Sequence, residues 1–387
     1  MTAPALPTPA ADAPAADMLA GIRRWVEIES QTGDIEGLAA LADRVTADYA
    51  ACGARVDRIA GRDGQGDHLV VRAPWAGASN EAGILILSHL DTVHPRGTLA
   101  RFPFSVDGDV AQGPGIYDMK GGAYIAMQAV TDLAARKGDD LARPNLPVTH
   151  LFVSDEEIGS PTSQALIEEL ARAAKYVLVT EPAREGGRIV IARKGVMRYY
   201  IQAHGEAAHA GARHQDGASA IAEIARLTLK FHGLTDYDRG ITCNVGEIGG
   251  GTRVNVVADH AWIWVDVRVP DARATAEVEA FVAGLTAEEP GVTIEITGGL
   301  NRAAYETSPA VAALFDHARE LADEIGFDLQ GLKTGGGSDG NFTAPIAPTL
   351  DGLGVDGKGG HTLYEQLYVS SLEPRRDLMR RLLETLR

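Results

Sequence analysis

The feature that most constrains the fold is a series of short apolar segments that alternate with helical patterns. Residues 83–89 (GILILSH), 147–153 (PVTHLFV) and 175–179 (KYVLV) are rich in Leu, Ile and Val. Apolar residues at helical spacing separate them, at 121–135 and 163–174. Strands that are apolar on both faces and alternate with helices are typical of a mostly parallel sheet covered on both sides. We therefore predict an α/β domain whose ligands bind beyond the carboxyl ends of its strands.

A different pattern between residues 193 and 303 predicts a second domain. The expected elements there are a strand, a helix, two strands, a helix and a strand, which is the order of the ferredoxin-like split βαβ unit. The length of 387 residues also exceeds what one hydrophobic core usually serves. We expect a first domain of residues 18–192 and 304–387, with residues 193–303 inserted into it. The Ala- and Pro-rich residues 1–17 are expected to form a disordered tail.

The composition argues against several classes of function. A net charge of −17 disfavours binding to the phosphate backbone of nucleic acids, which requires clustered Lys and Arg. No apolar run approaches the roughly 20 residues of a membrane helix, and the N-terminal segment is a poor secretory signal. The two cysteines, Cys52 and Cys243, lie far apart and cannot make a disulfide framework. We expect a cytoplasmic protein that binds neither nucleic acid nor membranes.

Three consecutive carboxylates follow the apolar segment that ends at residue 153. Asp155, Glu156 and Glu157 stand in the sequence FVSDEEIGS. Like charges this close repel one another unless solvent or a bound cation offsets them. Taken alone, the triplet is typical of a solvated turn. The alternative is a metal site in which the two glutamates have different roles.

Further candidates also lie at or just after expected strand ends. His89 and Asp91 point to the same side of an extended segment, and an Asp beside a ligating His commonly orients its ring. Asp118, between glycine pairs, is either a helix N-cap or a group that the glycines let approach a ligand. Glu181 ends the strand YVLV, and His361 follows two glycines. Each signal is weak by itself, because surface pairs, helix caps and structural histidines are common.

Together these positions predict a metal centre. Nitrogen and carboxylate donors that all follow strand ends form a set suited to two zinc ions, and Asp118 is able to bridge them. The predicted ligands are His89, Asp118, Glu157, Glu181 and His361. Glu156 then stays free to act as a base.

The same motifs resemble those of a known family. The segments SHLDTV, GPGIYDMKGG, SDEEIGS, TEP, GEAAHAG and GGGSDGNF, followed by GGH, occur in the order and spacing of the clan MH dizinc aminoacylases and carboxypeptidases. This family includes glutamate carboxypeptidase, acetylornithine deacetylase and succinyl-diaminopimelate desuccinylase. The similarity runs from about Met18 to the C-terminus, and glutamate carboxypeptidase (carboxypeptidase G) is the nearest of these.

The resemblance implies a role for each residue of the metal centre. It implies two zinc ions per subunit, with cobalt and manganese open as substitutes. One zinc ion would be held by His89, Asp118 and Glu181, and the other by Asp118, Glu157 and His361. Asp91 would orient His89, and Glu156 would be the general base.

The resemblance also implies that the inserted domain, residues 193–303, is a lid that forms a homodimer. His209 would reach the active site of the partner subunit and help to bind the developing oxyanion; without the resemblance it is typical of a surface loop. Asn255 would line the substrate site. Arg302 would hold the free carboxylate of the substrate, and a salt bridge at the domain junction is the alternative.

We therefore expect a zinc-dependent hydrolase that cleaves the amide bond next to a C-terminal amino acid, with glutamate slightly favoured as the leaving group. An aminoacylase or deacetylase of small N-acyl amino acids would use the same metal centre and stays open. A catalytically silent dimeric binding protein would be indicated by loss of Glu156 or of a ligand, and all of these are present. The acyl group, the leaving amino acid and the roles of Arg268 and Lys194 stay open.

Overall fold

The computed structural model describes residues 13–75, 82–135 and 144–387. Most of the expected N-terminal tail therefore lies outside the described residues. Its last five residues, however, open helix α1 (Ala13–Val26), because an Ala-rich segment has a high helix propensity. No helix among the described residues combines the length and the apolar character needed to cross a membrane.

The chain divides into two compact units, which are described separately. Unit 1 comprises Met1–Ile191, Thr307–Leu332 and Ser338–Arg387, and unit 2 comprises Ala192–Glu306 and Lys333–Gly337. The assignment of the last segment to unit 2 differs from the sequence prediction, which returned this Gly-rich turn to the first domain. The reason is local: Arg193 Nη1 donates to Gly336 O at 3.0 Å.

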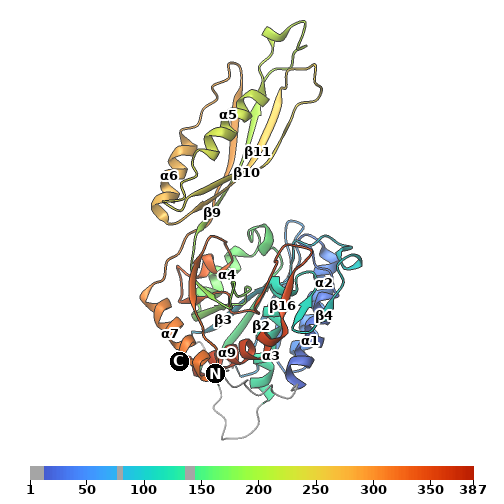
Figure 1. The fold of residues 1–387 in the computed structure, drawn as a ribbon, viewed down its shortest axis with the longest axis vertical. Coiled ribbons are helices and arrows are strands. Elements are labelled where there is room, and N and C mark those ends of the chain that lie inside the picture. Colours follow the sequence, from blue (N-terminus) through green and yellow to red (C-terminus); the bar gives the residue numbers. More distant parts are fainter. Residues whose placement is uncertain (1–12, 76–81, 136–143) are drawn as a thin grey trace, which may run out of the picture. The chain divides into compact units, whose positions relative to one another are not determined.

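A six-stranded sheet lies at the centre of unit 1, with the order β1-β2-β6-β3-β7-β14 (Figure 1). The strands are β1 (Arg55–Ile59), β2 (His68–Arg72), β6 (Val148–Val153), β3 (Gly83–His89), β7 (Ala174–Val179) and β14 (Thr349–Leu350). The pairs β3/β6, β3/β7 and β7/β14 are parallel, whereas β1/β2 and β2/β6 are antiparallel. The predicted mostly parallel sheet is confirmed.

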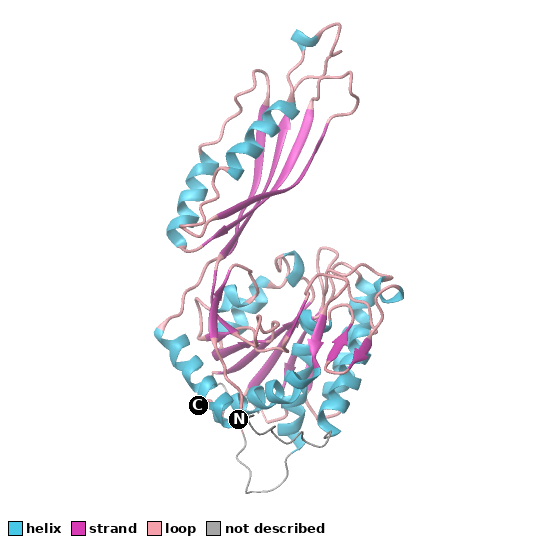
Figure 2. Ribbon diagram, viewed as in Figure 1, coloured by secondary structure: helices cyan, strands magenta, loops and turns pink. Residues whose placement is uncertain are grey.

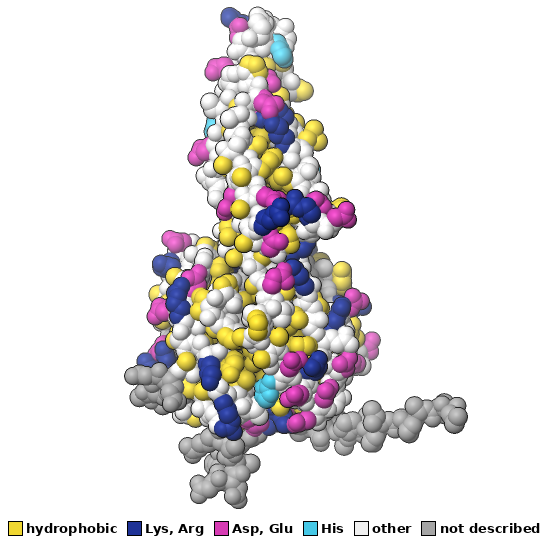
Figure 3. Space-filling view, turned by 90° about the vertical axis from the view of Figure 1, so that its left-hand side faces the viewer, with side chains coloured by type: hydrophobic (Ala, Val, Ile, Leu, Met, Phe, Trp, Pro, Cys, Tyr) yellow, Lys and Arg dark blue, Asp and Glu magenta, His cyan; other side chains and the backbone are white. Residues whose placement is uncertain are grey.

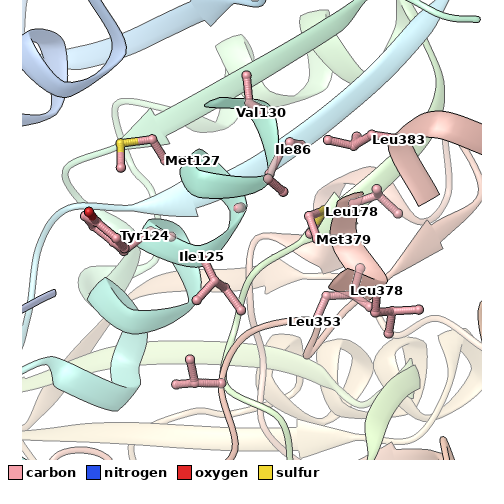
Figure 4. Packing of buried hydrophobic residues seen from close by; sticks show 14 of the residues in the cluster. Ile86, Tyr124, Ile125, Met127, Val130, Leu178, Leu353, Leu378, Met379 and Leu383 are labelled. Atoms are coloured by element: carbon pink, nitrogen blue, oxygen red, sulfur yellow. The ribbon is translucent and has the colours of Figure 1, made fainter. Parts of the chain in front are cut away.

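Helices cover both faces of this sheet, which explains why its central strands are apolar throughout. One face packs against α1, α2 (Ile35–Ala50), α3 (Gly121–Ala135), α7 (Pro309–Ile325) and α9 (Leu372–Thr385). The other face packs against α4 (Gln164–Arg172) and α8 (Gly340–Thr343). Within β3, Ile86 faces the first core and Leu85 the second. Figure 4 shows Ile86 among the side chains of α3 and α9 that fill the first core.

Unit 1 also contains short strands that the sequence did not reveal. The strands β15 (Gly357–Lys358), β16 (Gln366–Tyr368), β5 (Val110–Gln112) and β4 (Ser105–Asp107) form a small sheet in that order. Two further strands, β8 (Ile189–Arg193) and β13 (Gly331–Thr334), pair with each other and belong partly to each unit. The small sheet was missed because segments of two or three residues are too short to show a hydrophobic period.

Unit 2 is a four-stranded antiparallel sheet with two helices, in the strand order β10-β11-β9-β12. Its elements are β9 (Gly195–His204), α5 (Ala220–His232), β10 (Thr242–Gly250), β11 (His260–Val269), α6 (Ala272–Ala283) and β12 (Thr293–Arg302). Both helices pack on one face of the sheet (Figure 2). This is the predicted β-α-β-β-α-β order. Acidic and basic side chains are interspersed on the face drawn in Figure 3.

Candidate metal centre

The strand order of unit 1 brings the predicted ligands to one edge of the sheet. The strands β6, β3 and β7 are neighbours and run parallel, so their carboxyl ends meet. His89 is the last residue of β3, Glu156 and Glu157 follow β6, and Glu181 follows β7. Asp118 and His361 reach this edge from the segments just before α3 and just after β15.

Asp118 lies between the two histidines and uses a different oxygen toward each. His89 Nε2 is 3.3 Å from Asp118 Oδ1, and His361 Nε2 is 3.4 Å from Asp118 Oδ2. On the first side, Glu181 Oε1 is 3.8 Å from His89 Nε2. On the second side, Glu157 Oε2 is 3.2 Å from His361 Nε2. These distances outline two adjacent sets of donors that share one carboxylate.

The acidic groups of the cluster are crowded and buried, so solvent alone does not stabilise their negative charges. Burial raises the pKa of Glu157 to about 7, and burial together with the charge of Asp118 raises the pKa of Glu181 well above its usual value. Hydrogen bonds with Asp118 and Glu157 raise the pKa of His361 to about 11. Despite its burial, Asp118 has a pKa below the usual range because both histidines bond to it.

This donor set fits divalent metal ions. Glu157 Oε1 is buried and has no hydrogen-bond partner among the residues that the structure describes. An unpaired buried carboxylate oxygen is costly unless a cation binds it. Ligand atoms of His89, Asp118 and Glu157 lie within 4.8 Å of one another, as do those of His89, Glu156 and Glu181. Imidazole and carboxylate groups are the ligands that zinc commonly takes in catalytic sites.

The three consecutive acids after β6 have different surroundings. Asp155 takes part in local structure: its carboxylate accepts hydrogen bonds from Thr162 N at 2.7 Å and from Ser163 Oγ at 2.5 Å. Glu157 contacts His361, as described above, and Glu156 lies near His89 and Glu181. Only two of the three acids, Glu156 and Glu157, therefore lie in the cluster of candidate ligands.

Asp91 contacts both His89 and the backbone of the acidic segment. His89 Nδ1 is 2.8 Å from Asp91 O, closer than the 3.5 Å that separates it from the Asp91 carboxylate. The carboxylate itself accepts hydrogen bonds from the backbone N–H groups of Glu156 and Glu157, both at 3.2 Å. Burial raises the pKa of Asp91 to about 6. Asp91 thus links the end of β3 to the segment that follows β6.

Glu365 is a contributor to the site that the sequence analysis missed. Its carboxylate accepts hydrogen bonds from the backbone N–H groups of Gly115, Tyr117 and Asp118 at 3.1, 2.9 and 2.9 Å, and it is fully buried. His94 Nε2 lies 2.6 Å from the same carboxylate. Glu365 therefore fixes the backbone that carries the shared ligand. The only sequence signal is an acid four residues after His361.

The predicted substrate residues lie in unit 2. His209 is exposed, and its Nδ1 accepts hydrogen bonds from the backbone of Gly211 and Ala212 at 3.1 and 3.2 Å, which leaves the proton on Nε2. Asn255 O accepts a hydrogen bond from Ala210 N, so the loops that carry His209 and Asn255 are paired. Arg302, at the end of β12, is buried.

The two residues whose roles were left open have local partners in unit 2. Arg268 Nε donates to Asp266 Oδ1 at 2.6 Å. Lys194 Nζ donates to Gly240 O at 2.5 Å. Neither contact assigns a function.

Comparisons with known proteins identify similar sequences and a similar fold. The family model of peptidase family M20/M25/M40 matches residues 85–385. Carboxypeptidase G2 of Pseudomonas sp. (strain RS-16) is 32% identical over 92% of this chain and 85% of its own length. A succinyl-diaminopimelate desuccinylase of Cereibacter sphaeroides is 28% identical over 76% of this chain and 81% of its own. An M20 family metallo-carboxypeptidase from Sulfolobus solfataricus has a similar fold, with a TM-score of 0.74 and 16% identity over 95% of this chain and 98% of its own.

Proposed function

We propose a function for this chain from its family: it belongs to peptidase family M20/M25/M40. The proposed reaction is hydrolysis of the amide bond next to a C-terminal amino acid, in the manner of a glutamate carboxypeptidase. The observation that carries the proposal is the pair of donor sets that share Asp118 at the carboxyl ends of β6, β3 and β7. Family membership makes the chain a hydrolase; the metal, the residue roles and the substrate are the parts proposed here.

Two zinc ions per subunit are proposed for the centre, with cobalt and manganese as substitutes. His89, Asp118 and Glu181 would hold one ion, and Asp118, Glu157 and His361 would hold the other. When bound, such ions polarise a carbonyl group and lower the pKa of water.

Each remaining residue of the site has a task that its position supports. Glu156 would accept a proton from the attacking water and then deliver it to the nitrogen of the leaving amine. Asp91 would keep Glu156 in place through the backbone hydrogen bond described above. The Nε2 proton of His209 would be donated to the oxygen on which charge develops. Arg302 would pair with the free carboxylate of the substrate, and Asn255 would line the substrate site.

The first experiment tests the reaction class. We expect zinc-loaded protein to release a free amino acid from at least one member of a panel of N-acyl amino acids and dipeptides that includes acyl-glutamates. Removal of the metal with a chelator should abolish release, and added zinc should restore it. The imidazole and carboxylate groups of the donor set cannot by themselves polarise the carbonyl group of the substrate. Silence across the panel, with bound zinc verified, would contradict the proposal.

The same panel distinguishes the second candidate function. An aminoacylase or deacetylase is supported by the similarity to a desuccinylase. It would cleave small acyl groups from amino acids and leave acyl-glutamates with large acyl groups intact, whereas a carboxypeptidase would cleave the latter and release glutamate.

A homodimer through residues 193–303 is also proposed, with His209 serving the active site of the partner subunit. Its support is that His209 is exposed and presents an Nε2 donor. Mixing inactive His209→Ala and Glu156→Ala subunits should then restore activity, because one site of each mixed dimer regains both groups. Each variant exchanged with itself is the control. No recovery after confirmed subunit exchange would contradict a site shared between subunits.

A further inference from the structure

A cavity of about 420 Å³ lies within unit 1, apart from the ligand cluster. It is bounded by the first turn of α9, by β16 and by the glycines at 186 and 187. Its walls include the aromatic rings of Phe327 and Tyr368 and the side chain of Arg375. None of these groups has a task in the proposed reaction.

Arg375 is a buried cation that interacts with the charge of Asp356 on the cavity wall. It is 3% exposed, and its guanidinium lies 5.7 Å from the centre of the Phe327 ring. Nη2 donates to Gly187 O, whereas Nη1 is buried without a hydrogen-bond partner among the residues that the structure describes. Burial lowers the pKa of Arg375 to about 10. A buried guanidinium N–H without an acceptor is costly, and a further carboxylate in the cavity would offset that cost.

Carboxylates on the cavity wall restrict what can bind beside Arg375. Asp109, Asp328 and Asp356 all line the cavity. Asp109 is occupied, because it accepts hydrogen bonds from Ser370 N and Oγ at 2.7 and 2.8 Å. Asp356 uses Oδ1 for the N–H of Gly357, and burial raises the pKa of Asp356. The three carboxylates around this single cation repel a simple anion, and the guanidinium repels a metal ion.

Glycine keeps the space between Arg375 and Asp356 open. A Cβ atom on Gly187 would come within 3.1 Å of Arg375 Nη2 and 3.6 Å of Asp356 Oδ2. The φ angles of Gly186 and Gly187 are 77° and 74°, a conformation that residues with L side chains rarely adopt. The backbone of Gly187 thus lies between the guanidinium, which donates to its O atom, and the Asp356 carboxylate, and the absence of a Cβ leaves space beside both groups.

We propose that this cavity binds a free α-amino acid as a zwitterion, with its carboxylate on Arg375 and its ammonium group on Asp356. The proposal rests on the proposed function in one respect: hydrolysis next to a C-terminal amino acid releases such a molecule. A neighbouring cavity of about 640 Å³ shares Asp356 and Tyr368 with the first and is also lined by Asp118 and His361. The proposed site therefore lies next to the cavity that Asp118 and His361 line.

Occupation of the site would act on the metal centre through a short stretch of chain. Asp356 immediately precedes β15, and His361 follows three residues after that strand ends. An ammonium group on Asp356 would hold the start of the segment that ends at His361.

The test is calorimetric titration of the full chain, stripped of metal, with a panel of α-amino acids. Binding is expected for at least one, and Arg375→Lys and Asp356→Asn should each weaken it by about tenfold or more. Lysine lacks the paired N–H donors of the guanidinium, and asparagine lacks the charge that pairs with the ammonium group. The half-buried Asp356 provides an independent variant if Arg375→Lys does not fold. Arg376→Lys is the matched control, since Arg376 lies on the same helix and pairs with Asp132 at 2.7 Å outside the cavity.

Several outcomes would overturn the proposal. These are no binding of any amino acid to folded wild-type protein, unchanged binding in Arg375→Lys and Asp356→Asn, loss of binding in Arg302→Ala, or equal binding of inorganic phosphate or of propionate, which lacks the amine. Metal-free protein hydrolyses nothing, so this result is independent of the reaction. Binding without hydrolysis by the zinc-loaded protein would refute only the proposed function.

Discussion

Replacement of Glu156 with glutamine is expected to lower kcat/KM by about 10³-fold while the protein keeps its metal, because general acid–base catalysis contributes roughly that factor. The two side chains have the same shape, so the hydrogen bond from Glu156 N to Asp91 is retained. Glutamine cannot accept the proton of water at neutral pH. The measurements are kcat/KM on the best substrate of the panel and metal content after dialysis.

Glu157→Gln is the matched comparison for this prediction. Its carboxylate lies 3.2 Å from His361 Nε2, and its second oxygen is buried without a partner among the described residues. We expect this variant to lose one of the two proposed metal ions, because an amide is a poorer ligand than a carboxylate. The division of roles would be supported if Glu156→Gln loses activity but keeps its metal, whereas Glu157→Gln loses both activity and metal. Equal metal loss in both variants would contradict it.

Much of the fold could be predicted because local patterns determine it. Residues of β3 alternate between two cores, so the strand is apolar throughout, and that is visible in the sequence. Parallel order then places the ends of β6, β3 and β7 together, which is why residues far apart in the chain were predicted to form one site. The small sheet of β15, β16, β5 and β4 was missed because its strands have two or three residues each.

The parts of the site that escaped prediction depend on contacts that no local pattern encodes. Asp155 was given no role, and the hydrogen bonds that its carboxylate accepts from Thr162 and Ser163 were not foreseen. Asp91 was expected to orient a histidine, and its bonds to the backbone of Glu156 and Glu157 were not foreseen. These roles depend on which way a side chain points after the backbone turns, and spacing along the chain does not specify it.

Glu365→Gln is expected to damage both the stability and the activity of the protein. The carboxylate accepts three backbone N–H groups, including that of Asp118 at 2.9 Å. Glutamine turns an NH₂ group toward donors, so at least one of them loses its acceptor inside the protein. The loss should lower the free energy of unfolding by about 3 kcal/mol, the scale of a buried hydrogen bond to a charged group.

If Glu365 positions Asp118, its replacement should also lower the activity of the folded protein, which a purely stabilising role would not require. Because Glu365 holds the backbone of the shared ligand, folded Glu365→Gln should also show kcat/KM lowered by about 10- to 100-fold, as for residues that orient metal ligands. Unfolding by denaturant and kinetics well below the unfolding midpoint separate the two effects. Glu373→Gln is the control, since that side chain lies in the first turn of α9 and is not one of the candidate ligands. Wild-type kcat/KM in folded Glu365→Gln would mean that the carboxylate stabilises the fold without positioning Asp118.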